Sequence, residues 1–497
     1  MKKNKILVPL VVFLSLLLGA GGMYVTMAAM DDNDPTMVLE EEEIEQLIEG
    51  NSDEVEEAST EIETDEEWIG KVEQAFETIS ERYVNEVDEA KLIEGAISGM
   101  LESLDDPYSV YMDQSTAEEF MESLGSSFEG IGAQVMMKDN KVTIEAPLRD
   151  SPAEEAGLRP NDQIIGIDGD NIDGLSLNEA VLEIRGEKGT TVTLTIERPG
   201  MNDSIDIDVV RDEIPIESVH SEVVEKNGKN IGILDILSFS EDTGERFEEE
   251  LIELENQGID GLVIDVRGNP GGYLNVVEDI GDLIIPGGEP VVQIEHRDGE
   301  RLRHISNLED EKEYQIVTLI DEGSASASEI LAAALKEAGG YDVVGKSSFG
   351  KGTVQQTIEM EDGSQIKLTL YRWLTSDGND INEEGVQPTV EVDQPDFFFA
   401  TPLDFDESIT FDTSSDHVKS AQMMLEAIGE EPGRTDGYFD RQTEDAVSSF
   451  QENQGIEVTG EINEETGDRL QELLIEVIQD RDSDLQFQKA IELLTAE

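Results

Sequence analysis

The apolar positions in the first third of the chain follow a helical spacing. One series recurs every three or four residues: Ile69, Val72, Phe76, Ile79 and Tyr83. A second series repeats this spacing before a stop at Asp105-Asp106-Pro107: Leu92, Ala96, Met100 and Leu104. Because this is the period of one face of an α-helix, the sequence predicts an N-terminal helical region over residues 68–125. We expect its apolar stripes to face the core or a second copy of the chain in a homodimer.

The spacing changes to that of β-strands over residues 126–200. Short runs rich in β-branched residues, separated by turns, cover residues 132–137, 141–146, 163–167 and 190–198. One short helical pattern occupies residues 177–184. Strands of this length with turn residues between them predict a small β-rich domain.

Residues 201–398 have the pattern of a larger α/β unit. Continuous apolar runs predict buried strands at 231–236, 261–266, 315–320 and 342–344. Helical patterns lie between them at 240–257 and 328–338. Buried strands that alternate with helices are typical of a sheet covered by helices. At 497 residues the chain is too long for one core, so the expected fold class is multidomain α/β.

The C-terminal part predicts a small helical unit. An acidic linker at 399–414 precedes it, the unit covers residues 415–475, and a helical tail covers 476–497. A near-repeat with an offset of 23 residues relates Gly437-Tyr438-Phe439 and Thr443 to Gly460-Glu461-Ile462 and Thr466. This pattern resembles the three-helix peptidoglycan-binding domain of many wall enzymes, which implies peptidoglycan as a partner. A generic acidic helical bundle is the alternative.

The N-terminus has the features of a membrane anchor. Lys2, Lys3 and Lys5 precede an uncharged run over residues 6–30, and a helix needs about 20 apolar residues to cross a bilayer. A cleaved signal peptide is the alternative to a transmembrane signal anchor over residues 1–30. Residues 31–67 hold 18 acidic residues and no Lys or Arg, which predicts an extended acidic tether. We therefore expect a single-pass protein of the cell membrane whose folded part lies outside the cytoplasm.

The charge and the residue types present narrow the function. The chain has 33 Lys and Arg against 116 Asp and Glu, a net charge of −83, which argues against nucleic acid as a partner. An acidic, solvated surface suited to high salt accounts for this balance. There is no Cys, and the four His residues have no metal-ligand spacing. We expect neither a metal nor a cofactor.

Two loops hold the candidate chemistry. Ser324-Ala325-Ser326-Ala327-Ser328 stands between an expected strand and an expected helix. Backbone N–H groups and the helix dipole at such a position can stabilise a developing oxyanion, although an ordinary N-cap serine is the alternative. In the second loop, Lys351 follows Ser326 by 25 residues and precedes Gln355 by 4.

This arrangement resembles the carboxy-terminal processing (tail-specific) serine peptidases over about residues 68–393. Two flanking motifs support the resemblance: Arg267-Gly268-Asn269-Pro270-Gly271-Gly272 and Tyr371-Arg372-Trp373-Leu374-Thr375. It implies that Ser326 is the nucleophile, Lys351 the general base and Gln355 the residue that orients the lysine. It also implies oxyanion-hole amides from Ala327 and from either Gly271 or Gly272.

The proposed base imposes a physical requirement. A lysine can accept a serine proton only when it is neutral, and a free lysine has a pKa near ~10.4. Activity near neutral pH therefore needs that pKa to fall by about 3. Burial disfavours the ammonium form, and residues 347–354 contain no carboxylate, which is consistent with a lysine kept away from acids. An exposed loop lysine is the alternative.

Residues 126–200 resemble a PDZ domain. The resemblance is carried by Gly130-Ile131-Gly132-Ala133 and by the run Ser151 to Leu158. It implies that Gly130, Ile131, Gly132 and Ala133 bind the terminal carboxylate of a peptide, because successive N–H groups form an anion nest and a strand edge can add a peptide. Arg185, at the end of the 177–184 helix, is a candidate contact that couples a bound tail to the peptidase core. Alternatively, Arg185 complements the dipole of its own helix.

These features predict a membrane-bound serine endopeptidase, a hydrolase with a Ser/Lys dyad. Its expected substrates are extracytoplasmic proteins, cleaved near C-terminal tails that the PDZ domain recognises. The alternative is a non-catalytic scaffold that tethers partners through its PDZ and wall-binding modules.

Overall fold

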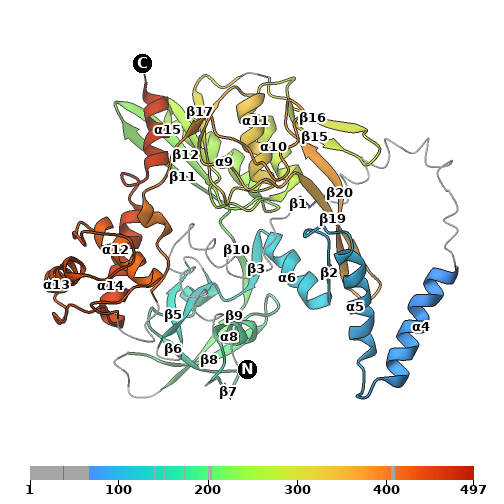
Figure 1. Cartoon of the computed structure of the whole chain (residues 1–497), viewed down its shortest axis with the longest axis horizontal. Helices are drawn as coiled ribbons and strands as arrows, with labels where there is room; N and C mark the ends of the chain where they lie inside the picture. Colours follow the sequence, from blue (N-terminus) through green and yellow to red (C-terminus); the bar gives the residue numbers. More distant parts are fainter. Residues whose placement is uncertain are drawn as a thin grey trace.

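The structure is a computed structural model that describes residues 37–38, 66–138, 141–148, 151–172, 174–199, 201, 204–309, 311–403 and 409–496. An α/β core lies at the top of Figure 1, a β-rich domain lies below it, and a C-terminal helical unit lies to the left. The N-terminal helices lie at the lower right of the view. The expected class, multidomain α/β, is confirmed.

The expected single-pass membrane location is not supported, and we withdraw it. No helix among the described residues is both long and apolar enough to cross a bilayer. The longest of them, α4 (Glu66–Arg82), has 17 residues and carries charges along its length, whereas a crossing needs about 20 apolar residues. The expected anchor over residues 1–30 lies outside the described residues, as does the tether over 31–67 apart from Met37–Val38 and the start of α4.

The N-terminal region contains the two expected helices, α4 and α5 (Glu89–Glu102). It also contains a strand and a third helix, β2 (Val110–Met112) and α6 (Gln114–Leu124). The strand pairs with β20 (Gln365–Leu374) of the core and so fixes this region to the core. The apolar stripe of α4 stays exposed, with Ile69 at 60% and Val72 at 57%. It therefore does not pack into the core of this chain.

The β-rich domain is a sheet with the strand order β4-β5-β6-β8-β9 and one additional strand, β7, beside β6. Its strands are β4 (Ala133–Lys138), β5 (Lys141–Pro147), β6 (Gln163–Ile167), β7 (Asp170–Asn171), β8 (Thr191–Glu197) and β9 (Ile205–Val210). Its helices are α7 (Pro152–Glu155) and α8 (Leu177–Ile184), and α8 lies beside β4. The buried side chains of Ile144, Val192 and Leu194 lie within its apolar core.

A two-stranded ribbon links the β-rich domain to the core. It consists of β3 (Ser127–Gly130) and β10 (Asp212–Pro215), which run antiparallel with Gly130 opposite Asp212. Figure 1 shows this ribbon between the two domains and beside α6. The loop that follows Gly130 therefore lies near the junction of the two domains.

The α/β core is built on a sheet with the order β11-β12-β13-β17-β18-β21. Its strands are β11 (Val219–Lys226), β12 (Lys229–Ile236), β13 (Gly261–Asp265), β17 (Gln315–Ile320), β18 (Asp342–Gly345) and β21 (Val390–Glu391). All neighbours from β12 to β21 pair in parallel. Because the buried strands carry apolar side chains on both faces, the sheet needs a cover on each side.

The two faces of this sheet have different covers. One face packs against α9 (Thr243–Gln257), α10 (Leu274–Ile284) and α11 (Ala327–Glu337). The other face, which includes Ile233, Val263 and Val317, packs against α15 (Leu485–Thr495). Buried side chains of α15 make this contact: Phe487, Ala490, Ile491 and Leu494. The expected helical tail is therefore a layer of the core.

A second sheet lies beside the first, with the order β14-β1-β19-β20-β15-β16. Its strands are β14 (Gly272–Tyr273), β1 (Met37–Val38), β19 (Thr353–Glu359), β20 (Gln365–Leu374), β15 (Pro290–Glu295) and β16 (Arg301–Ile305). The backbone of β1 runs parallel to both of its neighbours, with Val38 opposite Tyr273 on one side and Gln355 on the other. This edge of the core thus holds an extended chain between β14 and β19.

The C-terminal unit has three helices, α12 (Asp416–Ala427), α13 (Arg441–Gln454) and α14 (Glu464–Gln479), which share one apolar cluster. A short 3-10 helix, η1 (Asp396–Phe399), precedes it. Two buried amides explain the near-repeat. Gln422 accepts from the Gly437 N–H and donates to Thr443 Oγ1, each at 2.9 Å. Gln451 accepts from the Gly460 N–H at 2.9 Å and donates to Thr466 Oγ1 at 3.0 Å.

Candidate active site

Ser326 occupies the N-cap of α11 in a backbone conformation that is rare for a residue with a side chain. Its φ is +54° and its ψ is −112°, and such strained conformations cost about 1–3 kcal/mol and cluster at functional sites. The residue is fully buried, and its Oγ has no hydrogen-bond partner among the described residues. Ser326 is therefore not an ordinary N-cap serine whose hydroxyl satisfies the helix.

The two neighbouring serines have hydroxyls that are engaged in the scaffold. Ser324 Oγ donates to the Val266 carbonyl at 2.8 Å and accepts from the Asp321 N–H at 3.0 Å. Ser328 Oγ donates to the Asn269 carbonyl at 2.9 Å. Of the three serines in this loop, Ser326 is the one whose hydroxyl makes no such contact.

Lys351 lies in the loop between β18 and β19 and is fully buried. Its Nζ lies 4.5 Å from the centroid of the Tyr108 ring, and its carbonyl accepts from Trp373 Nε1 at 2.7 Å. The structure therefore excludes an exposed loop lysine.

An acid from the N-terminal region acts on this lysine through space. Burial raises the pKa of Asp106, but hydrogen bonds from Ser109, Thr369 and the Tyr108 N–H, together with the charge of Lys351, lower it below its ordinary value. The sequence around Lys351 contains no acid, but the folded chain brings Asp106 within its electrostatic reach. Asp106, from the Asp105-Asp106-Pro107 motif that ends the second predicted helix, is thus part of the site.

Gln355 lies on β19 and is also fully buried. Its Nε2 donates to Thr353 Oγ1 and to Thr369 Oγ1, both at 2.9 Å. Its Oε1 has no hydrogen-bond partner among the described residues. The two threonines hold the amide so that its oxygen remains an available acceptor.

The Glu329 carboxylate joins two loops, which we name the serine loop (residues 321–326) and the lysine loop (residues 346–352). Its Oε1 accepts from Ser348 Oγ at 2.5 Å and from the Gly350 N–H at 2.7 Å. Its Oε2 accepts from the Ser326 N–H at 2.8 Å and from the Lys351 N–H at 2.9 Å. Burial raises the pKa of Glu329, and these donors oppose the rise. The sequence analysis missed this role, although a glutamate three residues after an N-cap serine is a signal for a capping box.

We name residues 267–272 the glycine loop, because it ends in Gly271 and Gly272 beside Ser326. A Cβ on Gly271, which has a φ of +110°, would lie 2.9 Å from Ser326 Cβ and 3.1 Å from the Ala327 N. A Cβ on Gly272 would lie 2.2 Å from the Phe239 carbonyl oxygen. Both positions therefore require glycine.

The backbone N–H groups near Ser326 differ in whether they already donate a hydrogen bond. The Gly271 N–H donates to Asn269 Oδ1 at 2.8 Å. Ala327 is the first residue of α11, so its N–H has no acceptor within the helix. The glycine loop is tied to the serine loop, because the Asn269 carbonyl accepts from the Ala325 N–H at 3.0 Å.

The predicted peptide-binding residues lie between β3 and β4. Gly130, Ile131 and Gly132 are buried and Ala133 begins β4, beside α8. The carbonyls of Ile131 and Gly132 accept from Ala153 and Leu148. Their own N–H groups donate no hydrogen bond among the described residues, as an anion nest requires.

Arg185 reaches out of the β-rich domain. Its Nη1 donates to Glu122 Oε1 of α6 at 2.6 Å, and its guanidinium lies 5.0 Å from the centroid of the Phe128 ring. The C-terminal carbonyls of α8 are bound by Arg211 instead, whose Nε donates to Ile184 O at 2.7 Å and whose Nη2 donates to Glu183 O at 3.1 Å. Arg211 therefore binds the last carbonyls of α8, and the side chain of Arg185 pairs with Glu122 of α6.

No group of three or more His, Asp or Glu side chains that could hold a metal occurs in the described part of the chain. The site consists of a buried serine, a buried lysine, a held amide and backbone N–H groups at a helix N-terminus. These are the groups that an acyl transfer by a serine nucleophile needs.

Comparison with known proteins gives the same picture. Family models match residues 230–392 (peptidase family S41), 130–209 (PDZ domain), 16–116 (activating protease CtpB N-terminal domain) and 414–470 (peptidoglycan binding domain). The chain is 50% identical over 426 residues to the carboxy-terminal processing protease CtpB of Bacillus subtilis (strain 168), which covers 86% of this chain and 89% of that one.

Two further likenesses are weaker. The carboxy-terminal processing protease CtpA of the same organism is 40% identical over 439 residues, 87% of this chain and 92% of that one. The solved structure of a photosystem II D1 C-terminal processing protease is 27% identical and covers 65% of this chain and 92% of that chain, with a TM-score of 0.39 that is too low to bear on the fold. On the strength of the two Bacillus relatives and the matched peptidase model, this chain belongs to peptidase family S41, as a serine-type carboxy-terminal processing protease.

Proposed function

We propose that this protease works through a Ser326/Lys351 dyad assisted by Gln355, and that it cuts proteins near C-terminal tails held by the PDZ domain. The observation that carries the proposal is the hydroxyl of Ser326, which is buried, strained into place and not engaged by the scaffold, in contrast to Ser324 and Ser328. Membership of a peptidase family sets aside the non-catalytic scaffold.

The first half of the reaction forms an acyl-enzyme. Neutral Lys351 takes the proton of Ser326 while Oγ attacks the substrate carbonyl, and the carbonyl oxygen becomes an oxyanion. Lysine acts as a base only when neutral; the burial of Lys351 favours that form, whereas the charge of nearby Asp106 opposes it. The lysine then gives the proton to the leaving amine as the peptide C–N bond breaks.

The second half regenerates the enzyme. Water adds to the acyl carbonyl as Lys351 takes one of its protons, the tetrahedral intermediate collapses, and the proton returns to Ser326 Oγ as the acid product leaves. The amide oxygen of Gln355 is available to accept a hydrogen bond from Lys351 and so to orient it. No metal or cofactor takes part in these steps.

Two backbone N–H groups stabilise the oxyanion in this mechanism. The first is that of Ala327, at the positive end of α11. We assign the second to Gly272, because the Gly271 N–H is already committed to Asn269. The strand position between β14 and β19 accepts an extended backbone, which suits a peptide substrate.

The other modules supply partners. We propose that Gly130, Ile131, Gly132 and Ala133 bind the tail carboxylate and that Arg185 passes this event to α6 and the core. The three-helix unit binds peptidoglycan. The exposed apolar stripe of α4 supports a homodimer, which light scattering of the purified protein tests directly.

The dyad is tested by Ser326→Ala and Lys351→Ala, assayed on casein and on a protein with an apolar C-terminal tail. Each change should abolish cleavage in a protein that still folds, since both residues serve one chemical step; Lys351→Ala should also lower the melting temperature, because it leaves a cavity at a fully buried position. Ser324→Ala is the matched control: it should keep activity and lose stability, because its hydroxyl bridges Val266 and Asp321. A dead, folded Ser324→Ala beside an active Ser326→Ala would refute the assignment.

A further inference from the structure

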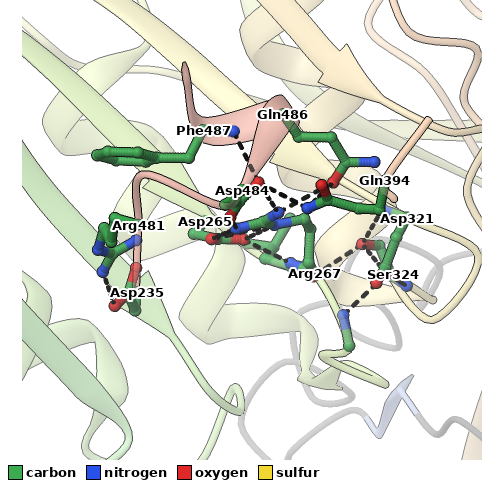
Figure 2. A network of polar contacts seen from close by, with 12 residues as sticks. Asp235, Asp265, Arg267, Asp321, Ser324, Gln394, Arg481, Asp484, Gln486 and Phe487 are labelled. Carbon is green, nitrogen blue, oxygen red and sulfur yellow. Dashed lines mark hydrogen bonds and ion pairs between the residues drawn. The ribbon is translucent and has the colours of Figure 1, made fainter. Parts of the chain in front are cut away.

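The chain that follows the C-terminal helical unit returns to the glycine loop. The Arg267 guanidinium donates to both oxygens of Asp484, from Nη1 at 3.1 Å and from Nη2 at 2.7 Å. Its Nη1 also donates to Gln486 Oε1 at 2.9 Å. Figure 2 shows Arg267 enclosed by these groups on one side and by Asp265 on the other. The first residue of the glycine loop is therefore held by residues more than two hundred positions away.

The chain that enters the C-terminal unit meets the chain that leaves it at the same place. Gln394 Nε2 donates to Asp484 Oδ1 at 2.6 Å, and the Leu485 N–H donates to Gln394 Oε1 at 3.1 Å. Gln486 Nε2 donates to the Val392 carbonyl at 3.0 Å. We name Gln394, Asp484 and Gln486 the clasp. It closes the base of the C-terminal unit, so that this unit is an insertion into the peptidase core.

Hydrogen bonds also hold the residues of the glycine loop that follow Arg267. The next N–H, that of Gly268, donates to Asp321 Oδ1 at 2.8 Å, and the same oxygen accepts from the Ser324 N–H at 3.1 Å. Asn269 then bonds to Gly271 and to the serine loop. The glycine loop is thus held by the clasp at its start and by the serine loop along its length.

The contact between Arg267 and Asp484 is a largely buried ion pair. The side chain of Arg267 is 16% exposed and that of Asp484 is 9% exposed. Burial disfavours both charges, but the Asp265 and Asp484 carboxylates hold the pKa of Arg267 above its ordinary value. Burial disfavours the Asp484 carboxylate and so raises its pKa. The charge and hydrogen bonds of Arg267 outweigh this effect of burial, and the pKa of Asp484 falls below its usual range. Loss of the Asp484 charge still leaves Arg267 paired with Asp265, so the core should fold without it.

We propose that Asp484, within the clasp, is a positioning residue of the peptidase: through Arg267 it holds the glycine loop where its amide meets the oxyanion. The inference rests on the proposed function, because it assumes that this loop supplies an oxyanion donor. It makes the segment after the C-terminal unit a part of the catalytic apparatus.

The test is Asp484→Asn in the full chain, assayed for kcat and KM on a fluorogenic peptide with an apolar C-terminal tail. A displaced oxyanion donor weakens the transition state but not substrate binding. Loss of one such donor costs about 10²–10³ in kcat, so a displaced one should cost about tenfold or more, with KM within about twofold. Asp482→Asn is the matched control, because Asp482 lies on the same segment and binds Lys226 of β11 rather than Arg267. It should leave kcat unchanged.

A double-mutant cycle separates positioning from general loosening. If Asp484 acts through Arg267, then Arg267→Lys combined with Asp484→Asn loses no more kcat than Arg267→Lys alone. Additive losses would overturn the proposal, as would an unchanged kcat in folded Asp484→Asn or a rise in KM alone. Should Asp484→Asn fail to fold, Gln486→Met removes one uncharged acceptor from Arg267, and a normal kcat in that variant overturns it.

Ser326→Ala, measured beside these variants, distinguishes failure of the proposed function from failure of the proposed role of Asp484. An active Ser326→Ala enzyme defeats the proposed function itself. An inactive Ser326→Ala enzyme beside a fully active Asp484→Asn enzyme defeats the clasp alone.

Discussion

Lys351 donates its backbone N–H at 2.9 Å to the carboxylate of Glu329, which lies 22 residues earlier in the chain, on α11. The oxygen that accepts it also accepts the N–H of Ser326 at 2.8 Å. One buried carboxylate therefore sets the spacing between the backbones of the proposed nucleophile and the proposed base. The proposed dyad therefore depends on Glu329, although the proposed mechanism gives this carboxylate no chemical step.

Glu329→Gln should therefore impair both activity and stability. A glutamine offers one acceptor oxygen to four donors, and its NH₂ group faces N–H groups that it cannot satisfy. A buried donor left without an acceptor costs about 1–3 kcal/mol, so we expect a clear fall in melting temperature. We also expect kcat to fall at least tenfold at temperatures where the variant is fully folded.

Glu337→Gln, on the same helix, is the matched control for Glu329→Gln. Glu337 is half-buried and accepts from the Asp377 N–H and the Asn379 amide, away from the loops of Ser326 and Lys351, so its replacement should leave kcat unchanged. A Glu329→Gln enzyme with the parent's kcat would contradict the proposed spacing role.

Arg185→Ala should change how a C-terminal tail affects cleavage while leaving stability nearly intact. The Arg185–Glu122 pair is about two-fifths exposed, and such surface pairs contribute about 0–1 kcal/mol. We expect the ratio of tailed to untailed substrate turnover to shift at least threefold, with a melting temperature close to the parent's.

For Arg211→Met we expect the opposite of the Arg185→Ala result. Arg211 is buried and binds two carbonyls at the end of α8, so its loss should lower the melting temperature and leave the turnover ratio of the folded protein unchanged. If Arg185→Ala retains the parent's ratio, the proposed coupling between the PDZ domain and the core is wrong.

Two deletions test the insertion of the C-terminal unit. Removal of residues 396–479, with Pro395 joined to Asp480 through a short Gly-Ser linker, keeps the clasp and α15. This protein should lose sedimentation with purified cell walls and cleave casein within about twofold of the parent. Truncation after Pro395 removes the clasp and uncovers one face of the central sheet, so that protein should lose both properties. Equal wall sedimentation by the parent and the first deletion would refute the wall-binding role.

Asp235 gives a prediction about pH. Burial and the charge of Asp265 raise the pKa of Asp235 to about 6, against the opposing effect of Arg481. A folded-state pKa above the unfolded one means that the folded protein holds the proton more tightly. Stability from this group is therefore present below about pH 4 and is lost as the pH rises through about 6.

Asp235→Asn removes that titration. Its melting temperature relative to the parent should rise between pH 5 and pH 7, whatever the constant cost of the substitution. The exposed Asp482→Asn should show no such trend over the same interval. A flat difference for Asp235→Asn would show that Asp235 does not titrate in this range.

Much of this architecture could be predicted from local patterns. Period and turn residues indicated α4 and α5, the β-rich domain, the buried strands β12, β13, β17 and β18, and the three-helix unit. These elements carry their own periodicity, and helix stops or glycine turns mark their ends. Ser326, Lys351 and Gln355 also stood out in the sequence because of their fixed spacing and motif context, and their catalytic roles stay a prediction.

The contacts that sequence analysis missed join residues distant in the chain. Asp106 acts on Lys351 from the segment that follows α5, so the absence of acids near Lys351 in sequence was misleading. Asp484 looked like one acid among 116, and α15 looked like a helical tail.

The strands β15, β16, β19 and β20 were not predicted, because many of their residues are polar or half-buried and the alternation is weak.

The place of α15 in the core also determines when the enzyme becomes competent during its own synthesis. A chain is made from its N-terminus, so β12, β13, β17 and β18 emerge long before the helix that covers one of their faces. The inserted helical unit can fold in the meantime, but Arg267 has no Asp484 to bind until the segment after that unit has been made. On the proposed mechanism, a growing chain therefore carries Ser326 and Lys351 without a braced glycine loop until the segment with Asp484 and α15 has been made.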